Sequence, residues 1–351
     1  MTGRHGTLVG GLVLLLVLAA GAAYLALRDR AGGAAARTCN GSEALCALRL
    51  DQVSLAATHN SMNAAADGFR DPSQEVGIGA QLDQGVRGLL VDAYLGVVRT
   101  AGSQPIVYTD VSDKRLGTLA NAVGDEEVQH ALRLREEAGR PPADAPRDVY
   151  LCHSYCELGA VLFSDTVRVL RNFLEGHSGE VLVMIIQDEL DAEQLVTVLE
   201  EGGLEPYLAS LDPGVPLPTL EEMVESGHRL VIGLENGDLA PLLPNVYDGG
   251  LVQEVPYDYS SLEELEDPRS CRPHRGQDGA PLFLLNHWVT PPSPELAAEA
   301  NAEDVLLGRA QRCAEERGHP VNLVAVDFAG SGDLLAAVEA LNDQSADEPS
   351  S

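Results

Sequence analysis

The sequence predicts an α/β fold, a (β/α)8 barrel of the TIM type with irregular connections, preceded by a transmembrane or signal segment. Most of eight short apolar runs lack the polar alternation of half-exposed strands, as expected for parallel strands that are buried on both faces. Longer amphipathic stretches separate these runs. No Gly-rich phosphate loop or dinucleotide fingerprint follows any run, which disfavours an open doubly wound sheet.

The predicted strands are rich in Val, Leu and Ile. They occupy residues 53–58, 88–93, 149–152, 181–187, 229–234, 251–255, 282–286 and 322–328. The run at 251–255 is the weakest. The segment 96–147 is too long for a standard connection, so we expect an elaborated loop with one helix, 126–137, over the mouth of the barrel.

Helices are predicted between the strands. Apolar residues recur every three to four positions over 165–174 and 192–201, and Ser293 followed by Pro and Glu is typical of a helix start. No internal repeat is present. We therefore expect one barrel domain over residues 38–342, followed by a polar tail over 343–351.

Residues 1–37 form a separate membrane-targeting segment. From Gly6 to Leu27, 22 residues carry no charge, and at about 1.5 Å per residue this run can cross a hydrocarbon core of roughly 30 Å. It is either an uncleaved anchor, which we favour because the run is longer than a usual signal sequence, or a signal peptide cut near 34–36. Arg residues flank both ends, so positive-inside counting does not fix the orientation.

Charge excludes one broad class of function. The chain has 23 Lys and Arg against 54 Asp and Glu, a net charge of −31. Such a surface repels phosphate backbones, so we expect no nucleic-acid partner. Any phosphate that this protein handles must meet a metal ion or a few basic side chains in a cleft.

The cysteines indicate an oxidising compartment. The six cysteines fall into three local groupings: Cys39 and Cys46, Cys152 and Cys156, and Cys271 and Cys313. An even number in a targeted protein favours disulfides formed outside the cytoplasm, with buried free thiols as the alternative. We expect a monomer, either a single-pass protein of the cell membrane with an extracytoplasmic domain or a secreted protein.

Three histidines stand at the carboxyl ends of predicted strands. His59, His153 and His287 each follow or close an apolar run. In a (β/α)8 barrel these ends meet at one mouth, where active sites form. A single histidine at a strand end is more often structural, but several at equivalent ends favour a site. Two imidazoles suit acid–base chemistry near neutral pH, one taking a proton and the other giving it.

Oxygen ligands for a metal ion lie at the same ends. Asp92 closes the second run, Asp188 and Glu189 close the fourth, and Asp327 lies in the last. Together with Asn60, Asp92 and one of the acids at 188 and 189 would offer hard oxygen ligands to Ca²⁺, with water completing the shell. Capping of the following helix is the structural alternative for these acids.

These motifs carry a resemblance to a known family. The set resembles the X-domain of phosphatidylinositol-specific phospholipase C, closest to secreted or anchored proteins of bacteria and plants, over roughly residues 50–190 with a similar closing strand at 322–328. The matching segments are Thr58-His59-Asn60-Ser61, the run 85–92 (GVRGLLVD), 151–154 (LCHS) and 181–189.

The resemblance implies an enzyme that cleaves a phospholipid-type phosphodiester. It implies that His59 is the general base that deprotonates the inositol 2-hydroxyl and His153 the acid that protonates the departing diacylglycerol oxygen. Asn60 and Asp92 match two ligands of the calcium-dependent branch, because the metal-independent branch has Arg at the position of Asp92. We also expect Arg87, His287 and Trp288 to contact substrate; core packing is an equal alternative for Trp288.

Two departures from the family pattern keep a second function open. Leu90 and Gln187 stand where the family has metal-binding acids, and Leu cannot bind a metal. The chain is therefore predicted to be either a phosphodiesterase with a weaker or differently completed calcium site, or an inactive barrel that binds a lipid head group or polyol at the cell surface. A glycerophosphodiesterase is disfavoured because its His-Arg and Glu-x-Asp sets are absent.

Overall fold

The computed structural model describes residues 38–109, 111, 117 and 124–347. The predicted anchor or signal segment, 1–37, lies outside the described residues, as does the end of the predicted tail, 348–351. Within the described ranges, no helix is both long and apolar enough to cross a membrane.

Parallel strands form the centre of the fold. In the described part of the chain they lie in the order β7-β6-β2-β1-β10-β9-β8, with every neighbouring pair parallel. They are β1 (Leu55–Thr58), β2 (Gly88–Ala101), β6 (Leu182–Glu189), β7 (Leu230–Leu234), β8 (Val252–Glu254), β9 (Leu282–His287) and β10 (Leu323–Val326). No strand ladder joins β7 to β8 among the described residues, so the sheet has the predicted barrel-type α/β topology without closure by hydrogen-bonded strands.

The third predicted strand, β4 (Asp148–Leu151), exists but runs antiparallel to its neighbour. The cause is the length of β2: its first half pairs with β6, and its second half leaves the barrel to pair with β4 and with β3 (Gln104–Thr109). The short β5 (Val161–Leu162) completes this extension. The expectation of eight equivalent barrel strands is corrected to seven parallel strands in the described chain.

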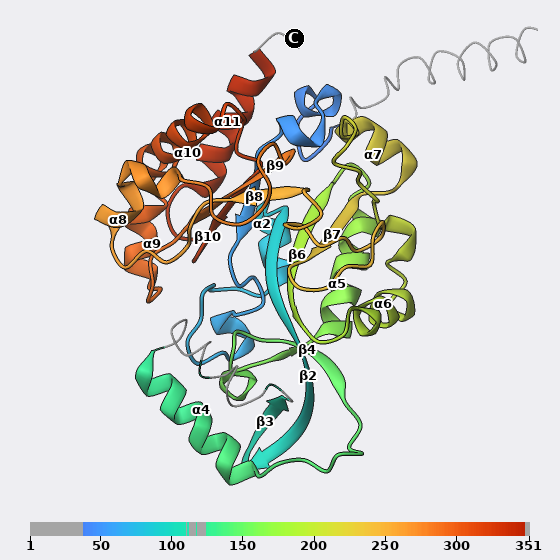
Figure 1. The fold of residues 1–351 in the computed structure, drawn as a ribbon, viewed down its shortest axis with the longest axis vertical. Helices are drawn as coiled ribbons and strands as arrows, with labels where there is room; N and C mark the ends of the chain where they lie inside the picture. Colours follow the sequence, from blue (N-terminus) through green and yellow to red (C-terminus); the bar gives the residue numbers. More distant parts are fainter. Residues whose placement is uncertain (1–37, 110, 112–116, 118–123, 348–351) are drawn as a thin grey trace, which may run out of the picture. The chain divides into compact units, whose positions relative to one another are not determined.

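The described parts of the insertion 96–147 contain more regular structure than predicted. Its first part is a β-hairpin of β2 and β3 around Gly102, whose φ of 58° is one that glycine adopts easily. The predicted helix is α4 (Asp125–Ala138), which packs on the hairpin through Leu134 and Ala138. Figure 1 shows α4 and β3 together at one end of the barrel domain.

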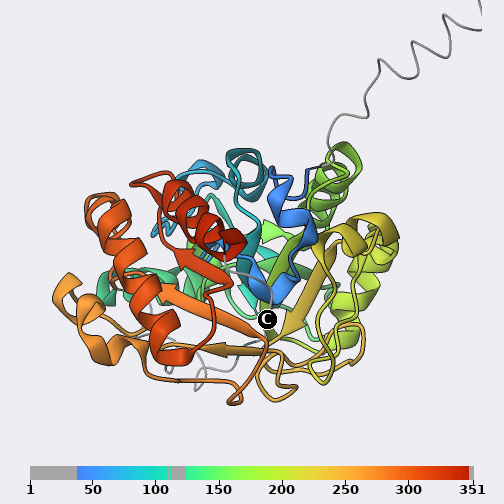
Figure 2. The ribbon, with the colours of Figure 1, turned by 90° about the horizontal axis from the view of Figure 1, so that it is seen from above.

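Helices surround the strands (Figure 2), with α5–α7 in green to yellow and α9–α11 in orange to red. Besides α4 they are α2 (Ile78–Gln84), α5 (Phe163–Gly176), α6 (Ala192–Glu201), α7 (Leu220–Ser226), α8 (Leu262–Glu266), α9 (Pro294–Ala300), α10 (Glu303–Arg317) and α11 (Leu334–Asp347). Short 3-10 helices are η1 (Ala44–Ala47), η2 (Leu50–Gln52), η3 (Ala65–Asp67), η5 (Cys156–Leu158), η6 (Glu205–Tyr207) and η7 (Pro268–Cys271). Ser293 caps α9 as predicted, accepting from Leu296 N at 3.2 Å, and α11 continues into the predicted tail.

Alternation along β6 separates two layers of core. Val183 and Ile185 pack with side chains from β1, β7, β8, β9 and β10, which fill the inside of the barrel. Leu182, Met184 and Ile186 belong to the layer beneath α5 and α6. Odd-numbered residues of β6 therefore face the barrel interior, and even-numbered ones face the helices.

The three predicted cysteine groupings are confirmed as disulfides. Cys39–Cys46 and Cys152–Cys156 close short segments, with separations of 7 and 4 residues. Cys271–Cys313 joins η7 to α10 across 42 residues.

The disulfides should differ in their contribution to stability. Replacing Cys271 and Cys313 by Ala should lower the free energy of unfolding by about 4 kcal/mol, and replacing Cys39 and Cys46 by about 2.5 kcal/mol, because the longer loop restricts the unfolded chain more. Urea unfolding of both variants without reductant measures the two losses. Equal losses, or a larger loss for the short loop, would contradict the expectation.

Candidate active site

A cavity of about 650 Å³ opens at the carboxyl ends of the parallel strands. Its wall is formed by residues within β2, β6, β8 and β9, by residues that follow β1, β7, β9 and β10, and by the turn after β4. The residues considered from sequence that line it are His59, Asn60, Leu90, Asp92, His153, Gln187, Trp288 and Asp327. The structure therefore brings together segments up to 268 residues apart in the chain.

His59 is held by the strand pair β1 and β10. Thr58 lies opposite Val326 in the register, and His59 N donates to Val326 O at 2.9 Å, so the next residue on each strand also becomes a neighbour. His59 Nδ1 lies 2.9 Å from Asp327 Oδ1. Burial raises the pKa of Asp327, and the hydrogen bond with His59 opposes that rise. An acceptor at Nδ1 orients the ring and leaves Nε2 available for a proton.

His153 reaches the same cavity from outside the barrel ladder. Cys152 N donates to Asp92 O at 3.2 Å, which sets the turn after β4 beside the mouth. The ring centroids of His59 and His153 are 6.4 Å apart, in an edge-to-face arrangement. This spacing allows both rings to contact oxygens of a single phosphate group. Burial and the neighbouring His59 lower the pKa of His153 to about 3, so these surroundings keep the ring neutral at pH 7.

Each of these three residues precedes a residue in the left-handed region. Asn60 (φ 45°), Ser154 (φ 60°) and Phe328 (φ 45°) directly follow His59, His153 and Asp327. This conformation costs a non-glycine residue about 1–2 kcal/mol and persists only where surrounding contacts impose it. The backbone is thus held in an unfavourable conformation at each point where a candidate catalytic side chain leaves it.

An aromatic wall lies beside His59. The Trp288 ring stacks on the imidazole with centroids 3.7 Å apart and planes inclined by 4°. Tyr257 continues the wall, 6.4 Å from Trp288, and is partly exposed. Trp288 therefore lines the cavity, and its contact with substrate stays a prediction.

The predicted metal ligands are only partly assembled. Asn60 and Asp92 line the cavity, and Gln187 lies opposite Asp92 in the β2–β6 register. Leu90 shares this wall, and in the described part of the chain no three His, Cys, Asp or Glu side chains are placed to hold a metal ion. Three oxygen ligands are fewer than the six to eight that Ca²⁺ takes. The set fits a weakly held cation, with water and a bound phosphate completing the shell.

The two acids at the end of β6 do not line the cavity. Asp188 lies on the outer face of the strand, where its carboxylate accepts N–H groups of Glu235, Asn236 and Gly237 at 2.8–3.2 Å. A Cβ at Gly237 would approach Asp188 Oδ2 to 2.7 Å. Its expected role as a metal ligand is therefore wrong, because these amides take up the carboxylate. Glu189 is odd-numbered and so lies on the inward face of β6, but it is not among the residues that line the cavity. Its carboxylate accepts a hydrogen bond from Gln187 Nε2 at 3.4 Å.

Arg87 lies far from the cavity. It precedes β2, at the amino end of the barrel and opposite the mouth. Its guanidinium pairs with Glu180 at 2.6 Å and donates to the carbonyls of Leu82 and Val86. The expectation that Arg87 contacts substrate is corrected: it ties the start of β2 to the segment before β6.

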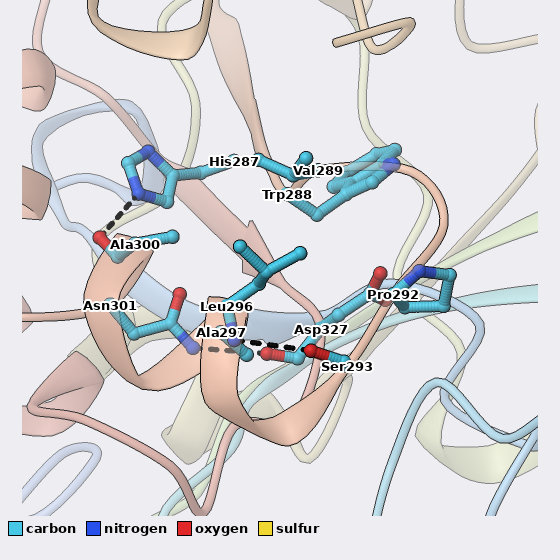
Figure 3. Close-up of a pocket in the computed structure, with 10 residues that line it drawn as sticks. All are labelled: His287, Trp288, Val289, Pro292, Ser293, Leu296, Ala297, Ala300, Asn301 and Asp327. Atoms are coloured by element: carbon cyan, nitrogen blue, oxygen red, sulfur yellow. Dashed lines mark hydrogen bonds between the residues drawn. The ribbon is translucent and has the colours of Figure 1, made fainter. Parts of the chain in front are cut away.

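His287 is a structural histidine. Its ring is fully buried, with Nε2 2.8 Å from Ala300 O and Nδ1 3.2 Å from Arg309. Figure 3 shows its side chain and that of Trp288 pointing to opposite sides of the chain. Because β9 alternates, His287 faces the helices and Asn286 faces the cavity. The expected substrate contact of His287 is therefore wrong.

Sequence reasoning missed an ionic network on the far wall. Arg275 contacts Glu235 at 2.7 Å, Glu254 at 2.5 Å and Tyr247 OH at 3.0 Å. Burial opposes the charge on Arg275, but Tyr247 and the two carboxylates outweigh it and raise its pKa. Glu235 follows β7 and Glu254 ends β8, so the strand-end rule applied to the histidines could have found both. Arg275 lies in a loop and carries no such signal.

Comparison with known proteins gives a family match. Residues 137–342, more than half of the 351 residues, match the family model described as PI-PLC X 1. A PI-PLC X domain-containing protein of Arabidopsis thaliana is 25% identical over 206 residues, which cover 53% of this chain and 46% of the plant protein. The chain thus spans about half the length of this curated relative. The family match includes His153 and Asp327 and begins after His59 and Asp92.

Solved structures also match. The phosphatidylinositol-specific phospholipase C of Listeria monocytogenes gives a TM-score of 0.48 at 13% identity, covering 86% of this chain and 97% of that chain. The enzyme of the same name from Staphylococcus aureus gives 0.49 at 12% identity, covering 85% and 94%.

Asp188 should prove structural when it is replaced. The variant Asp188→Ala should lose about 2–5 kcal/mol of unfolding free energy, because three backbone N–H groups lose their acceptor. Its affinity for Ca²⁺ should be unchanged, whereas Asp92→Ala should weaken it. Urea unfolding and calorimetric titration with Ca²⁺ measure the two effects. An Asp188→Ala protein of normal stability that no longer binds Ca²⁺ would restore the ligand assignment.

Stability should fall with acidification through His287. Burial and the charge of Arg309 lower its pKa to about 3. Below about pH 6.5 the unfolded state therefore binds a proton that the folded state does not, and this residue alone removes about 1.6 kcal/mol of unfolding free energy as pH falls from 6.5 to 5. Urea unfolding across this range should show the loss, and His287→Gln should reduce it, leaving the part that the lowered pKa of His153 contributes. An unchanged loss in His287→Gln would exclude this cause.

Proposed function

This chain belongs to the PI-PLC X family, and from that premise we propose that it is a phosphoric diester hydrolase acting on an inositol-type phospholipid or a related diester. The observation that carries the proposal is the pair His59 and His153, 6.4 Å apart across one cavity. Two imidazoles at this spacing can serve the attacking and the departing oxygen of one phosphate.

His59 is proposed as the general base. Asp327 accepts from its Nδ1–H, which leaves the lone pair of Nε2 to take a proton from the attacking hydroxyl, either of the head group or of water. The oxygen then forms a bond to phosphorus while the bond from phosphorus to the glycerol oxygen breaks. Trp288 covers one face of the ring and restricts its rotation. The main contribution of Asp327 is to orient the His59 ring, because the nitrogen that acts as base must lie about 2.6–3.2 Å from the hydroxyl oxygen.

His153 is proposed as the general acid, a role that requires a proton. Burial and His59 disfavour the charged ring and lower its pKa to about 3. An anionic diester between the two rings favours the protonated form, since an opposite charge within about 4–6 Å raises the pKa of an imidazole. Substrate binding thus prepares His153 to protonate the glycerol oxygen as it leaves.

A calcium ion is part of this proposal. Asn60, Asp92 and Gln187 would hold it together with water and a phosphate oxygen. When bound, Ca²⁺ would offset the negative charge of the phosphate. Among the described residues that line the cavity, the one Lys or Arg side chain is Arg275, and it is already paired with two carboxylates. With one carboxylate among the three ligands, we expect weak binding that tightens when substrate is present.

The opposite wall suits a polyhydroxylated head group. Glu235, Glu254 and Arg275 present acceptors and donors side by side, and Asn286 Oδ1 is a buried acceptor without a partner among the described residues. Tyr257 and Trp288 offer an apolar face next to them. This combination of polar groups and aromatic surface is typical of sites for small polar ligands. A substrate such as phosphatidylinositol, named for the bacterial proteins above, is therefore proposed.

Leu90 favours a second candidate function. It lines the cavity beside Asp92 and removes one metal ligand from the family pattern. A barrel without turnover that binds a lipid head group or polyol at the cell surface fits this loss. Calorimetry that detects head-group binding, with no turnover under any divalent metal, would favour it over the hydrolase.

The membrane is proposed as the place of action. The apolar run of residues 6–27 would keep the domain at the cell membrane or direct its secretion. Three disulfides support an extracytoplasmic location, since such bonds persist in oxidising compartments.

Replacement of the two histidines tests the hydrolase. In mixed micelles with phosphatidylinositol, His59→Ala and His153→Ala should each lose about 10²–10⁴-fold in kcat. His228→Ala, at an exposed position, is the matched control and should keep full activity. Chelation of Ca²⁺ should lower the rate of the unaltered protein, with recovery on addition of the ion. Full activity of either of the two cavity variants would rule out the proposed roles.

A further inference from the structure

The two cavity histidines are supported in different ways. The ring of His59 is held by Asp327 and stacked on Trp288. For His153, no side chain within the described ranges makes a hydrogen bond to the ring, which meets the His59 ring in an edge-to-face contact. The direction of the His153 imidazole must therefore come from its backbone and from the packing of the turn that carries it.

That turn is closed by a covalent bond. Cys152 and Cys156 form a disulfide with a Cα–Cα distance of 5.1 Å, and His153 lies between them in the sequence. Both cysteines are buried, at 0% and 1% exposure, in a cluster with Phe69 and Tyr94. Within the turn, Ser154 adopts a φ of 60° and Tyr155 N donates to His153 O at 2.6 Å.

The end of the turn is anchored separately. Glu157, in η5, pairs with Arg135 of α4 at 2.7 Å, and both side chains are buried. Arg135 also donates to Thr109 O at the end of β3, which ties the turn to the hairpin extension of β2. β4 pairs with antiparallel strands on both sides, so the turn that follows it is not held between parallel strands as His59 is. The disulfide, the ion pair and the hydrogen bond to Thr109 O take the place of that support.

We propose that the Cys152–Cys156 disulfide is a positioning element for His153, which fixes the direction of the imidazole towards the phosphate cavity. The inference rests on the proposed function of His153 as the acid. A proton donor must be held within about 0.5 Å of its productive position, and a displacement of about 1 Å can lower the rate about 10²-fold. Because both sulfurs are buried, the disulfide acts as a permanent clamp.

The leaving group distinguishes a misplaced acid from a damaged fold. An alkoxide such as the diacylglycerol oxygen needs a proton as it departs, whereas p-nitrophenolate departs without one. In the full chain, Cys152→Ala with Cys156→Ala should lower kcat on phosphatidylinositol by at least about tenfold. The KM should change less than about threefold, and kcat on p-nitrophenyl inositol phosphate should stay within about threefold of the unaltered protein.

The matched control removes a different short disulfide. Cys39→Ala with Cys46→Ala should leave kcat unchanged on both substrates, because that bond is outside the cavity. Equal losses on both leaving groups, or full activity of the Cys152 and Cys156 variant on phosphatidylinositol, would overturn the clamp.

A second variant covers failure to fold. If the double variant does not fold, Ser154→Gly loosens the turn with both cysteines retained, because glycine admits conformations that a Cβ forbids. It should show the same dependence on the leaving group, with a smaller loss on phosphatidylinositol. Equal activity on both substrates, at the level of the unaltered protein, would count against the clamp.

A spectroscopic measurement separates the clamp from the proposed function. If the unaltered chain hydrolyses neither substrate, the hydrolase proposal fails, and imidazole Cε1–H resonances then test the clamp alone. In the Cys152 and Cys156 variant, the His153 resonance should shift and broaden while that of His59 stays in place. An unchanged His153 resonance would overturn the proposal.

Discussion

The parallel pairing of β1 with β10 is the constraint on which the candidate site depends. It sets His59 beside Asp327 across 268 residues of sequence, because the register that joins Thr58 to Val326 continues one residue further on each strand. A one-residue slip of either strand would turn its own side chain, His59 or Asp327, to the other face and separate the pair. Burial of both strands on their two faces is what makes such a slip costly.

The second constraint is the length of β2. This strand serves the barrel through its first half and the hairpin extension through its second, and Asp92 lies where the two parts meet. The antiparallel β4 is bound to that extension, so its following turn delivers His153 to the mouth from the side. The site is thus built partly from the parallel barrel strands, which hold His59, and partly from the inserted antiparallel strands, which hold His153. This explains why the two imidazoles are supported in different ways.

Sequence patterns predicted which segments are strands more reliably than how those strands pair. Apolar runs located the seven parallel strands of the described residues, since burial on both faces leaves a strong compositional signal. The direction of β4 has no such signal, and His153 reaches the mouth although the premise that it ends a parallel strand was wrong. Arg87 and Asp188 were misplaced because their ligand-like chemistry also suits ion pairing and backbone capping, which only the three-dimensional neighbours reveal.

Location of the phosphate is the most direct test of the central claim that two imidazoles act on one phosphorus. A crystal structure of the full chain with a non-hydrolysable phosphonate analogue of phosphatidylinositol would locate it. We expect one phosphonate oxygen within about 2.6–3.2 Å of a ring nitrogen of His59 and another within the same reach of His153. A phosphonate that contacts neither ring, or binds outside the cavity, would contradict the shared role of the two histidines.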